Sequence, residues 1–285
     1  MPADVTGIAV VDKAAGWTSH DVVAKARGLL GTRKIGHSGT LDPDATGVLL
    51  LGVGGVTRVL RFLSPLPKSY TAEVVLGVET STLDASGAVV ARHDMSPTMD
   101  EVRAAAASLT GDILQVPPMV SAVQVGGRRL HELAREGIEV EREARPVTVH
   151  RFDVEPTDDP RVLRIAVDCS SGTYVRSLAA DLGRLLGGGA HLRSLRRTAI
   201  GPFTIEVARP LAAVELLPAV RAVDHLPRLD VPRERVAVGG VVGGDAAGGD
   251  GPWAVVEDGQ LLAVYERSSR GDRIKPAVVL IHDRS

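Results

Sequence analysis

The amino-acid sequence predicts an α+β fold, in which a mixed, largely antiparallel sheet forms the core and a small β domain follows it. Segments with strand and helix patterns succeed one another irregularly, without the repeated strand–helix–strand units of a doubly wound parallel sheet. After Pro227 the chain changes to short valine-rich pieces separated by glycines. A chain of 285 residues is long enough for one large and one small domain. We therefore expect domains at residues 1–228 and 229–285.

The N-terminal part of the chain combines strand and helix signals. Residues 6–11 form an apolar run that is typical of a strand. Thr18, followed three residues later by Asp21, matches a capping box, so a helix is expected to begin there and to run to about Leu30. Residues 48–53 fit a buried strand or helix. From Tyr70 to Val78 apolar and mostly polar residues alternate, which predicts a half-buried strand.

The rest of the chain continues this mixture. Thr98 and Glu101 predict a second capping box, and the helix that it begins should end near Leu109, before Gly111. Residues 174–186 fit another helix, closed by three consecutive glycines. Further strands are expected at residues 119–125, 146–154 and 162–169. In the small β domain we expect strands at residues 236–242, 253–256, 261–265 and 278–282.

Composition excludes several classes of protein. Hydrophobic residues make up 44% of the chain, and no apolar run approaches the ~18 residues that a membrane-spanning helix needs. The N-terminus lacks a signal-peptide pattern, and a single cysteine, Cys169, excludes an internal disulfide framework. We expect a soluble, cytoplasmic protein without membrane contact, in which Cys169 is a small buried thiol. Because no dimerisation pattern stands out, we expect a monomer.

The charged residues are unevenly distributed, although the net charge is only −2. Residues 22–72 hold seven lysines and arginines against two aspartates, and residues 161–201 hold seven arginines against two aspartates. Residues 79–112, in contrast, hold six acidic residues against two arginines. The two basic segments also carry the motifs described below. We therefore expect them to form a phosphate-binding surface around the active site.

The most informative segment is residues 36–47, which read GHSGTLDPDATG. Its glycines let the backbone turn and let a ligand approach closely, while Pro43 stiffens the chain and disfavours a helical conformation at Asp42. The apolar run that follows would anchor this loop. A loop of this kind is a typical setting for a catalytic carboxylate, so Asp42 is the candidate catalytic residue.

This loop resembles the signature Gly-His-x-Gly-x-Leu-Asp-Pro-x-Ala-Thr-Gly of the TruB-type tRNA pseudouridine synthases. Further motifs similar to those of the family lie at residues 12–19, 68–70, 170–176 and 188–197, in the family's order. The resemblance implies a core of the pseudouridine synthase type and a PUA-like, RNA-binding C-terminal domain. It also implies an isomerase that converts uridine 55 in the TΨC loop of tRNA, after flipping the nucleotide out of its stack, without a cofactor.

The resemblance also assigns roles to individual residues. Asp42 corresponds to the essential catalytic carboxylate, and Arg176 to its ion-pair partner. Tyr70 corresponds to the tyrosine that stacks on the target uracil and is implicated in removing the C5 proton, and His37 to the histidine that fills the space left by the flipped base. The remaining substrate-binding residues that the resemblance implies are Gly39, Thr40, Asp84, Tyr174 and Leu195.

The chemistry of this reaction suits a carboxylate. Pseudouridine formation breaks the glycosidic C–N bond, rotates the base, joins C5 to C1′ and releases the C5 proton, with no redox step. Asp42 can add to C1′ as a nucleophile or remove the C2′ proton as a base, and the sequence does not choose between these roles. Both roles require an ionised carboxylate. Because burial alone would raise the carboxyl pKa, an opposite charge such as Arg176 is needed nearby.

Two other functions fit parts of the sequence. Residues 31–38 differ by one residue from a phosphate-binding P-loop, but His37 replaces the lysine and the segment follows a helix pattern instead of a strand. The basic segments would also suit a tRNA-binding chaperone without catalysis. The combination of Asp42, Tyr70 and Arg176 favours the enzyme. None of the eight histidines clusters with cysteine or carboxylates, so we expect no metal.

Overall fold

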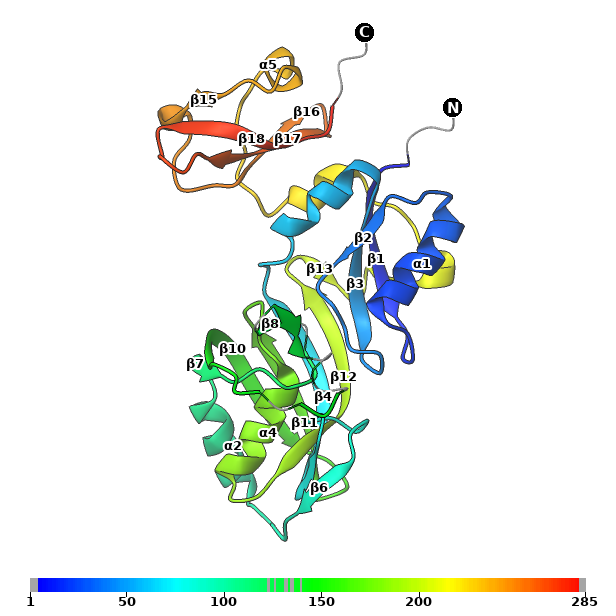
Figure 1. The fold of residues 1–285 in the computed structure, drawn as a ribbon, viewed down its shortest axis with the longest axis vertical. Helices are drawn as coiled ribbons and strands as arrows, with labels where there is room; N and C mark the ends of the chain where they lie inside the picture. Colours follow the sequence, from blue (N-terminus) through cyan, green and yellow to red (C-terminus); the bar gives the residue numbers. More distant parts are fainter. Residues whose placement is uncertain are drawn as a thin grey trace. The chain divides into compact units, whose positions relative to one another are not determined.

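The computed structural model describes residues 5–121, 124–125, 127–130, 133, 136–138 and 140–281. The chain divides into two compact units, whose elements are labelled in Figure 1. The first unit comprises Met1–Pro43, Gly47–Pro65 and Gly201–Ser285, and the second comprises Asp44–Thr46 and Leu66–Ile200. In both units the strands pair mainly antiparallel, which confirms the predicted α+β class. The expected domain boundary at residue 228 stays a prediction.

The core of the second unit is an antiparallel sheet with the strand order β12, β4, β11, β10, β7 (Figure 1). These strands are β4 (Lys68–Leu76), β7 (Gly111–Gln115), β10 (Arg145–Pro156), β11 (Val162–Cys169) and β12 (Ala190–Ile200). Tyr70 of β4 lies opposite Val167 of β11 and Arg197 of β12. Because β4 has a partner on both edges, its backbone is held along its whole length.

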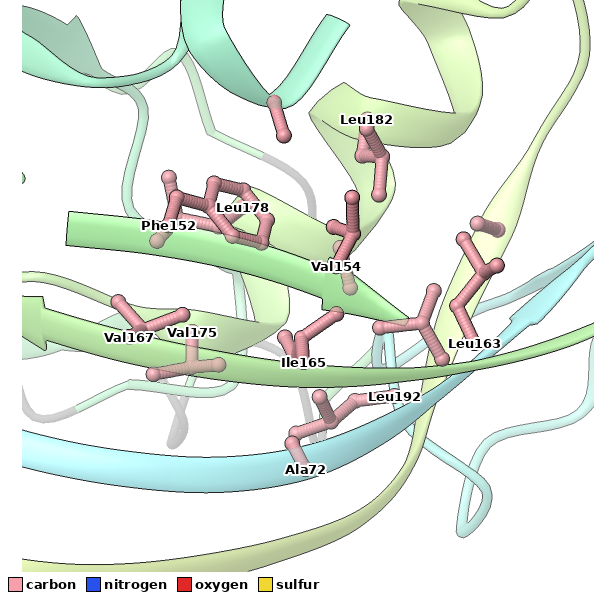
Figure 2. Close-up of a cluster of buried hydrophobic side chains, with 14 of the residues drawn as sticks. Ala72, Phe152, Val154, Leu163, Ile165, Val167, Val175, Leu178, Leu182 and Leu192 are labelled. Atoms are coloured by element: carbon pink, nitrogen blue, oxygen red, sulfur yellow. The ribbon is translucent and has the colours of Figure 1, made fainter. Parts of the chain in front are cut away.

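Two helices, α2 (Met99–Ser108) and α4 (Val175–Leu185), pack on this sheet. The apolar positions of α4 recur every three or four residues and face a buried cluster that also contains side chains of β4, β10, β11 and β12. Figure 2 shows Val175, Leu178 and Leu182 of the helix within this cluster. Burial of apolar area, at about 25 cal/mol per Å², therefore holds α4 against the strands.

Short strand pairs complete the second unit. They are β5 (Val78–Thr80) with β6 (Val89–Arg92), and β8 (Gln124–Val125) with β9 (Arg128–Arg129). The turn between β5 and β6 includes Leu83, which adopts a positive φ of 62°. Non-glycine residues adopt this conformation rarely, and it is found mostly where the surrounding structure fixes it.

The first unit is built around β3 (Thr46–Val53), which is buried almost throughout. β1 (Gly7–Lys13) and β2 (Ile35–Ser38) both pair with it antiparallel, and β14 (Arg209–Pro210) adds to β1 in parallel. The helix α1 (Ser19–Leu30) contributes Val22, Val23 and Ala26 to the core beside β1, β2 and β3. The other elements of this region are β13 (Phe203–Thr204) and the 3₁₀ helices η1 (Gly54–Arg58), η2 (Leu60–Phe62), η3 (Leu211–Ala213) and η4 (Ala219–Val223).

The C-terminal part of the first unit has a sheet of its own, with the order β15, β18, β17, β16. Its elements are α5 (Arg233–Ala237), β15 (Val242–Gly243), η5 (Gly244–Ala246), β16 (Trp253–Glu257), β17 (Gln260–Arg267) and β18 (Arg273–Val279). Trp253 and Tyr265 are buried in its core. Two arginines link this sheet to η1 and η2: Arg58 donates to the Val279 carbonyl, and Arg61 pairs with Glu266.

Most predicted elements are confirmed, including both capping boxes. Thr18 and Asp21 exchange side-chain-to-backbone hydrogen bonds at the start of α1, and Thr98 and Glu101 do the same at the start of α2. The prediction of a strand at residues 119–125 is wrong at residues 119–121, which form bends, and residues 122–123 lie outside the described residues. Pro117 and Pro118 lack the N–H groups that a strand ladder needs.

Other segments also differ from the predictions, among them β2, β6 and β7, which were not predicted as strands. Val236 lies in α5 instead of a strand, because Pro232 and an acidic first turn favour a short helix there. The last strand is β18, which starts before residue 278; the charged residues that alternate with Ile274 hid it, and His282 lies outside the described residues. β12 was not predicted, because its arginines interrupt the apolar pattern.

Candidate active site

The loop that carries Asp42 connects β2 to β3 in the first unit. Side chains from two other elements hold the backbone on each side of this residue. Before it, the Leu41 N–H donates to Ser19 Oγ at 2.9 Å. After it, the Pro43 carbonyl accepts from Lys13 Nζ at 2.8 Å and from the Gly16 N–H at 3.0 Å. The main chain at Asp42 is therefore fixed from both directions.

Lys13 is the central residue of this arrangement. It ends β1, and only 1% of its surface is exposed. Its ammonium group also donates to the Trp17 carbonyl at 2.6 Å and to the Ala14 carbonyl at 3.0 Å. A buried charge is stable only when its hydrogen-bonding capacity is satisfied, and three carbonyl oxygens meet that need here. Lys13 was not predicted as a site residue, although a lysine at the end of an apolar strand could have indicated a buried charge.

The other predicted residues of the first unit lie in the same loop and strand. His37 is in β2, opposite Leu51 of β3, and its ring meets the ring of His20 edge-on at 5.7 Å between centroids. Gly39 follows β2 with a φ of 78°, a conformation that glycine adopts without strain. Thr40 is exposed, and Asp42 itself is half-buried.

In the second unit, Arg176 lies in the first turn of α4 and 6% of its side chain is exposed. Its Nη1 atom donates to the Thr82 carbonyl at 3.1 Å and lies 3.4 Å from Asp84 Oδ2. Its Nη2 atom donates to the Val120 carbonyl at 2.9 Å. The structure thus brings together two predicted residues, Arg176 and Asp84. This ion pair was not itself predicted.

Asp84 is held by its own turn. Its Oδ1 atom accepts hydrogen bonds from Thr82 Oγ1 at 2.6 Å, from Ser86 Oγ at 2.6 Å and from the Ser86 N–H at 3.0 Å. Leu83, whose φ is positive, lies between Thr82 and Asp84 and accepts a backbone hydrogen bond from Leu192. Because both carboxylate oxygens have partners, the turn presents Asp84 to Arg176 in a fixed orientation.

Tyr70 and Leu195 lie on adjacent strands, β4 and β12, and both pack against the hydrophobic cluster of the second unit. Close to Tyr70 in β4 is Lys68, which is buried and donates to the Leu66 carbonyl at 2.7 Å. Burial, together with the positive charge of Arg197, lowers the pKa of Lys68 to about 8. Burial also raises the pKa of the Cys169 thiol to about 11, which agrees with the inert buried thiol that was expected.

The basic residues of the two segments differ in burial, and Arg196 is half-buried. Lys68, Arg176 and Arg197 are buried, so they belong to the interior of the second unit and not to an open phosphate-binding surface. The exposed basic residues of the two segments are Lys25, Arg27, Arg33, Lys34, Arg58, Arg61, Arg161, Arg164, Arg184 and Arg193. In the described part of the chain no helix is long and apolar enough to cross a membrane, and no three His, Cys, Asp or Glu side chains gather as metal ligands would.

Solved structures share this fold over nearly the whole chain. A chain of an H/ACA ribonucleoprotein, bound to a substrate RNA containing 2′-deoxyuridine, is 25% identical with a TM-score of 0.71, over 97% of this chain and 86% of that chain. A chain of an archaeal box H/ACA ribonucleoprotein complex is 25% identical with a TM-score of 0.72, over 98% and 87% of the two chains.

The P-loop alternative is not supported, since residues 31–38 lead from α1 into β2 instead of from a strand into a helix.

The sequence comparisons identify the class. Residues 27–175 match the profile described as the TruB family pseudouridylate synthase N-terminal domain, and residues 176–225 match the tRNA pseudouridylate synthase B C-terminal domain. The protein is thus a pseudouridine synthase, an isomerase of uridine, as predicted. Two relatives named tRNA pseudouridine synthase B are similar to it. The one from Arthrobacter sp. is 44% identical over 96% of both chains, and the one from Rhodococcus jostii is 55% identical over 75% of this chain and 72% of its own. The chain belongs to the TruB family.

Proposed function

We propose that this protein converts uridine 55 in the TΨC loop of tRNA to pseudouridine. The relatives that are similar over almost the entire chain are named tRNA pseudouridine synthase B, which supports tRNA as the substrate. The observation that carries the proposal is the way the loop is held: Ser19 and Lys13 bind the backbone on both sides of Asp42. A reacting carboxylate needs such a fixed carrier, because a displacement of about 1 Å can cost about 100-fold in rate.

In this proposal Asp42 is the essential carboxylate. It either attacks C1′ and displaces the uracil, or removes the C2′ proton, so that the uracil departs and a glycal remains. After the base has rotated, C5 bonds to C1′, which displaces the Asp42 carboxylate in the first route and returns the proton to C2′ in the second. The C5 proton then leaves and N1 of the base takes up a proton, so the product is an isomer of uridine and no electrons are transferred. Arg176 supplies the positive charge that keeps Asp42 ionised.

The remaining predicted residues bind the flipped nucleotide. Tyr70 stacks on the uracil and takes part in removing the C5 proton, and His37 fills the space that the base leaves in the RNA. The other substrate contacts are Gly39, Thr40, Asp84, Tyr174 and Leu195. Exposed arginines and lysines of the basic segments bind the RNA phosphates, and residues 229–285 form a PUA-like domain that adds RNA contacts. The protein acts on tRNA in the cytoplasm, as a monomer.

The test is mass mapping of pseudouridine in unmodified tRNA incubated with the purified protein alone. We expect one modified site, uridine 55, and no modification of a transcript that carries cytidine there. Asp42→Asn removes the charge with little change in volume, so it should abolish conversion while RNA affinity stays within a few-fold. Turnover of this variant at the wild-type rate would overturn the role of Asp42. Modification at another position would overturn the substrate.

A further inference from the structure

The start of α4 is joined to the end of β7 by one buried side chain. Gln115 is the last residue of β7, and 2% of its surface is exposed. Its Oε1 atom accepts from the Tyr174 N–H at 2.8 Å, and its Nε2 atom donates to the Tyr174 carbonyl at 3.1 Å. The amide thus pairs with both backbone groups of one residue, as a neighbouring strand would. On its other edge, β7 is fixed by β10, where Arg145 lies opposite Gln115.

Two further contacts connect the same segments. Ser177 Oγ donates to the Val116 carbonyl at 3.0 Å, and Arg176 Nη2 donates to the Val120 carbonyl at 2.9 Å. Gln115, Val116 and Val120 therefore contact Tyr174, Ser177 and Arg176, respectively. Gln115 contributes its side chain, which binds the backbone of Tyr174, the N-cap residue of α4. Val116 and Val120 instead contribute backbone carbonyls, which accept hydrogen bonds from side chains of α4.

The beginning of α4 depends on this contact because its own sequence defines it poorly. Among the described residues, no side chain caps this helix and no acidic residue lies in its first turn. α1 and α2, in contrast, both begin with a capping box. A pocket of about 350 Å³, lined in part by Gln115, Ser171, Gly172 and Tyr174, adjoins the N-cap residue. On that side Tyr174 therefore borders a pocket, and the amide of Gln115 restrains its backbone.

We propose that Gln115 is a positioning residue for the uridine-modifying site. By fixing the backbone of Tyr174, it sets where Arg176 enters the space between Thr82, Asp84 and Val120, and where the Tyr174 ring meets the substrate. This role rests on the proposed function, in which both residues serve the reaction. Gln115 itself touches neither substrate nor reacting atoms; it acts through the start of α4.

The first measurement compares Gln115→Met with the wild type in pseudouridine formation on a TΨC stem-loop RNA. Methionine keeps the length of the side chain and removes the amide. We expect kcat to fall at least tenfold while KM stays within threefold. In Gln115→Glu, which keeps an acceptor for the Tyr174 N–H and loses the donor, kcat should lie between these values. Val102→Ala, in the core of α2, is the control for lost stability: its melting temperature should fall, with kcat unchanged at 25 °C.

A double-mutant cycle with Arg176→Lys separates positioning from a general structural effect. If Gln115 acts through Arg176, adding Gln115→Met to Arg176→Lys should lower kcat less than threefold further. The proposal would be overturned if kcat of the double variant were at least tenfold below that of Arg176→Lys alone. An unchanged kcat in Gln115→Met would overturn it as well. A fall in kcat of Val102→Ala that matches its loss of stability would overturn it as well.

Hydrogen exchange of the RNA-free protein tests the positioning independently of the reaction. In Gln115→Met the amides at residues 174–177 should exchange at least tenfold faster, while those of α2 keep their rates. If Gln115→Met left the exchange rates at the start of α4 unchanged, the proposal would be overturned, even if the wild type converted the RNA as expected. If the wild type failed to convert the RNA but the exchange changed as expected, the proposed substrate would be wrong and the restraint by Gln115 would stand.

Discussion

In the first unit, buried side chains hold the backbone on both sides of Asp42, whereas in the second unit backbone carbonyls hold the side chain of Arg176. The first arrangement determines the path of the main chain that carries Asp42. The second determines the position of the guanidinium itself. Changes to Lys13 should therefore reduce stability more than the rate of the reaction, and changes to Arg176 should have the opposite balance.

Among the variants that test this comparison, Arg176→Lys should have the largest effect on the reaction. A lysine keeps the charge but cannot reach Thr82, Asp84 and Val120 together, because its ammonium is a point charge and not a planar fork. We expect kcat to fall about 100-fold, the usual cost of losing one oriented donor in an active site, with a small change in melting temperature. Arg184→Lys, at an exposed position of the same helix, is the matched control and should keep its kcat within twofold. A variant Arg176→Lys with normal kcat would contradict the comparison.

Lys13→Met should show the opposite pattern. The variant removes a buried donor of three hydrogen bonds and leaves carbonyl groups near Asp42 without it. We expect a loss of about 3 kcal/mol in the free energy of unfolding, measured in urea, and a fall in kcat of about tenfold. Arg103→Met, at an exposed position of α2 outside the basic segments, should change neither. If Lys13→Met kept its stability but lost more activity than Arg176→Lys, the expected balance between stability and rate would be contradicted for Lys13.

A further prediction concerns Lys68, a buried lysine in the second unit that has the positive charge of Arg197 beside it. Its pKa is about 8 in the folded protein and 10.5 when unperturbed. Below pH 8 Lys68 is protonated in both the folded and the unfolded protein, so burial of its charge lowers the free energy of unfolding by its full amount. Between pH 8 and 10.5 the unfolded chain binds the proton and the folded protein does not, so stability rises with pH. Relative to Lys68→Met, the wild type should therefore gain unfolding free energy across this range.

Urea unfolding of both proteins at intervals from pH 8 to 10.5 measures this gain. Lys275→Met, at an exposed position of β18, is the matched control, and its difference from the wild type should not follow the same curve. A difference between wild type and Lys68→Met that stayed constant over the whole range would contradict the lowered pKa.

The sequence predicted those parts of the fold that depend on neighbouring residues. Capping boxes at Thr18 and Thr98 locate two helices because their hydrogen bonds join residues three apart. β12 was missed because pairing with β4 over a long sequence separation, and not its own pattern, makes it a strand. Val236 was misplaced because a valine suits a strand and a helix alike until its neighbours are considered.

The candidate site shows the same division. The motifs indicated Asp42, Tyr70 and Arg176, but not what holds the site residues in place. Lys13 and Pro43, or Gln115 and Tyr174, are far apart in the chain and meet only through the fold. A buried polar side chain looks like an ordinary surface residue in a sequence, because burial is a property of the tertiary structure. Asp84 was predicted as a substrate-binding residue from the family resemblance, whereas its turn and its ion pair with Arg176 are seen only in the structure.

The Asp42 loop closes a local hairpin, since β2 ends at Ser38 and β3 begins at Thr46. Both stems are strands in register, and β1 covers the opposite edge of β3. A short chain segment therefore closes this ring at little entropic cost, and its contacts are among those that can form early as the polypeptide leaves the ribosome. The loop that carries Asp42 should consequently open only when β3 itself loses its partner strands.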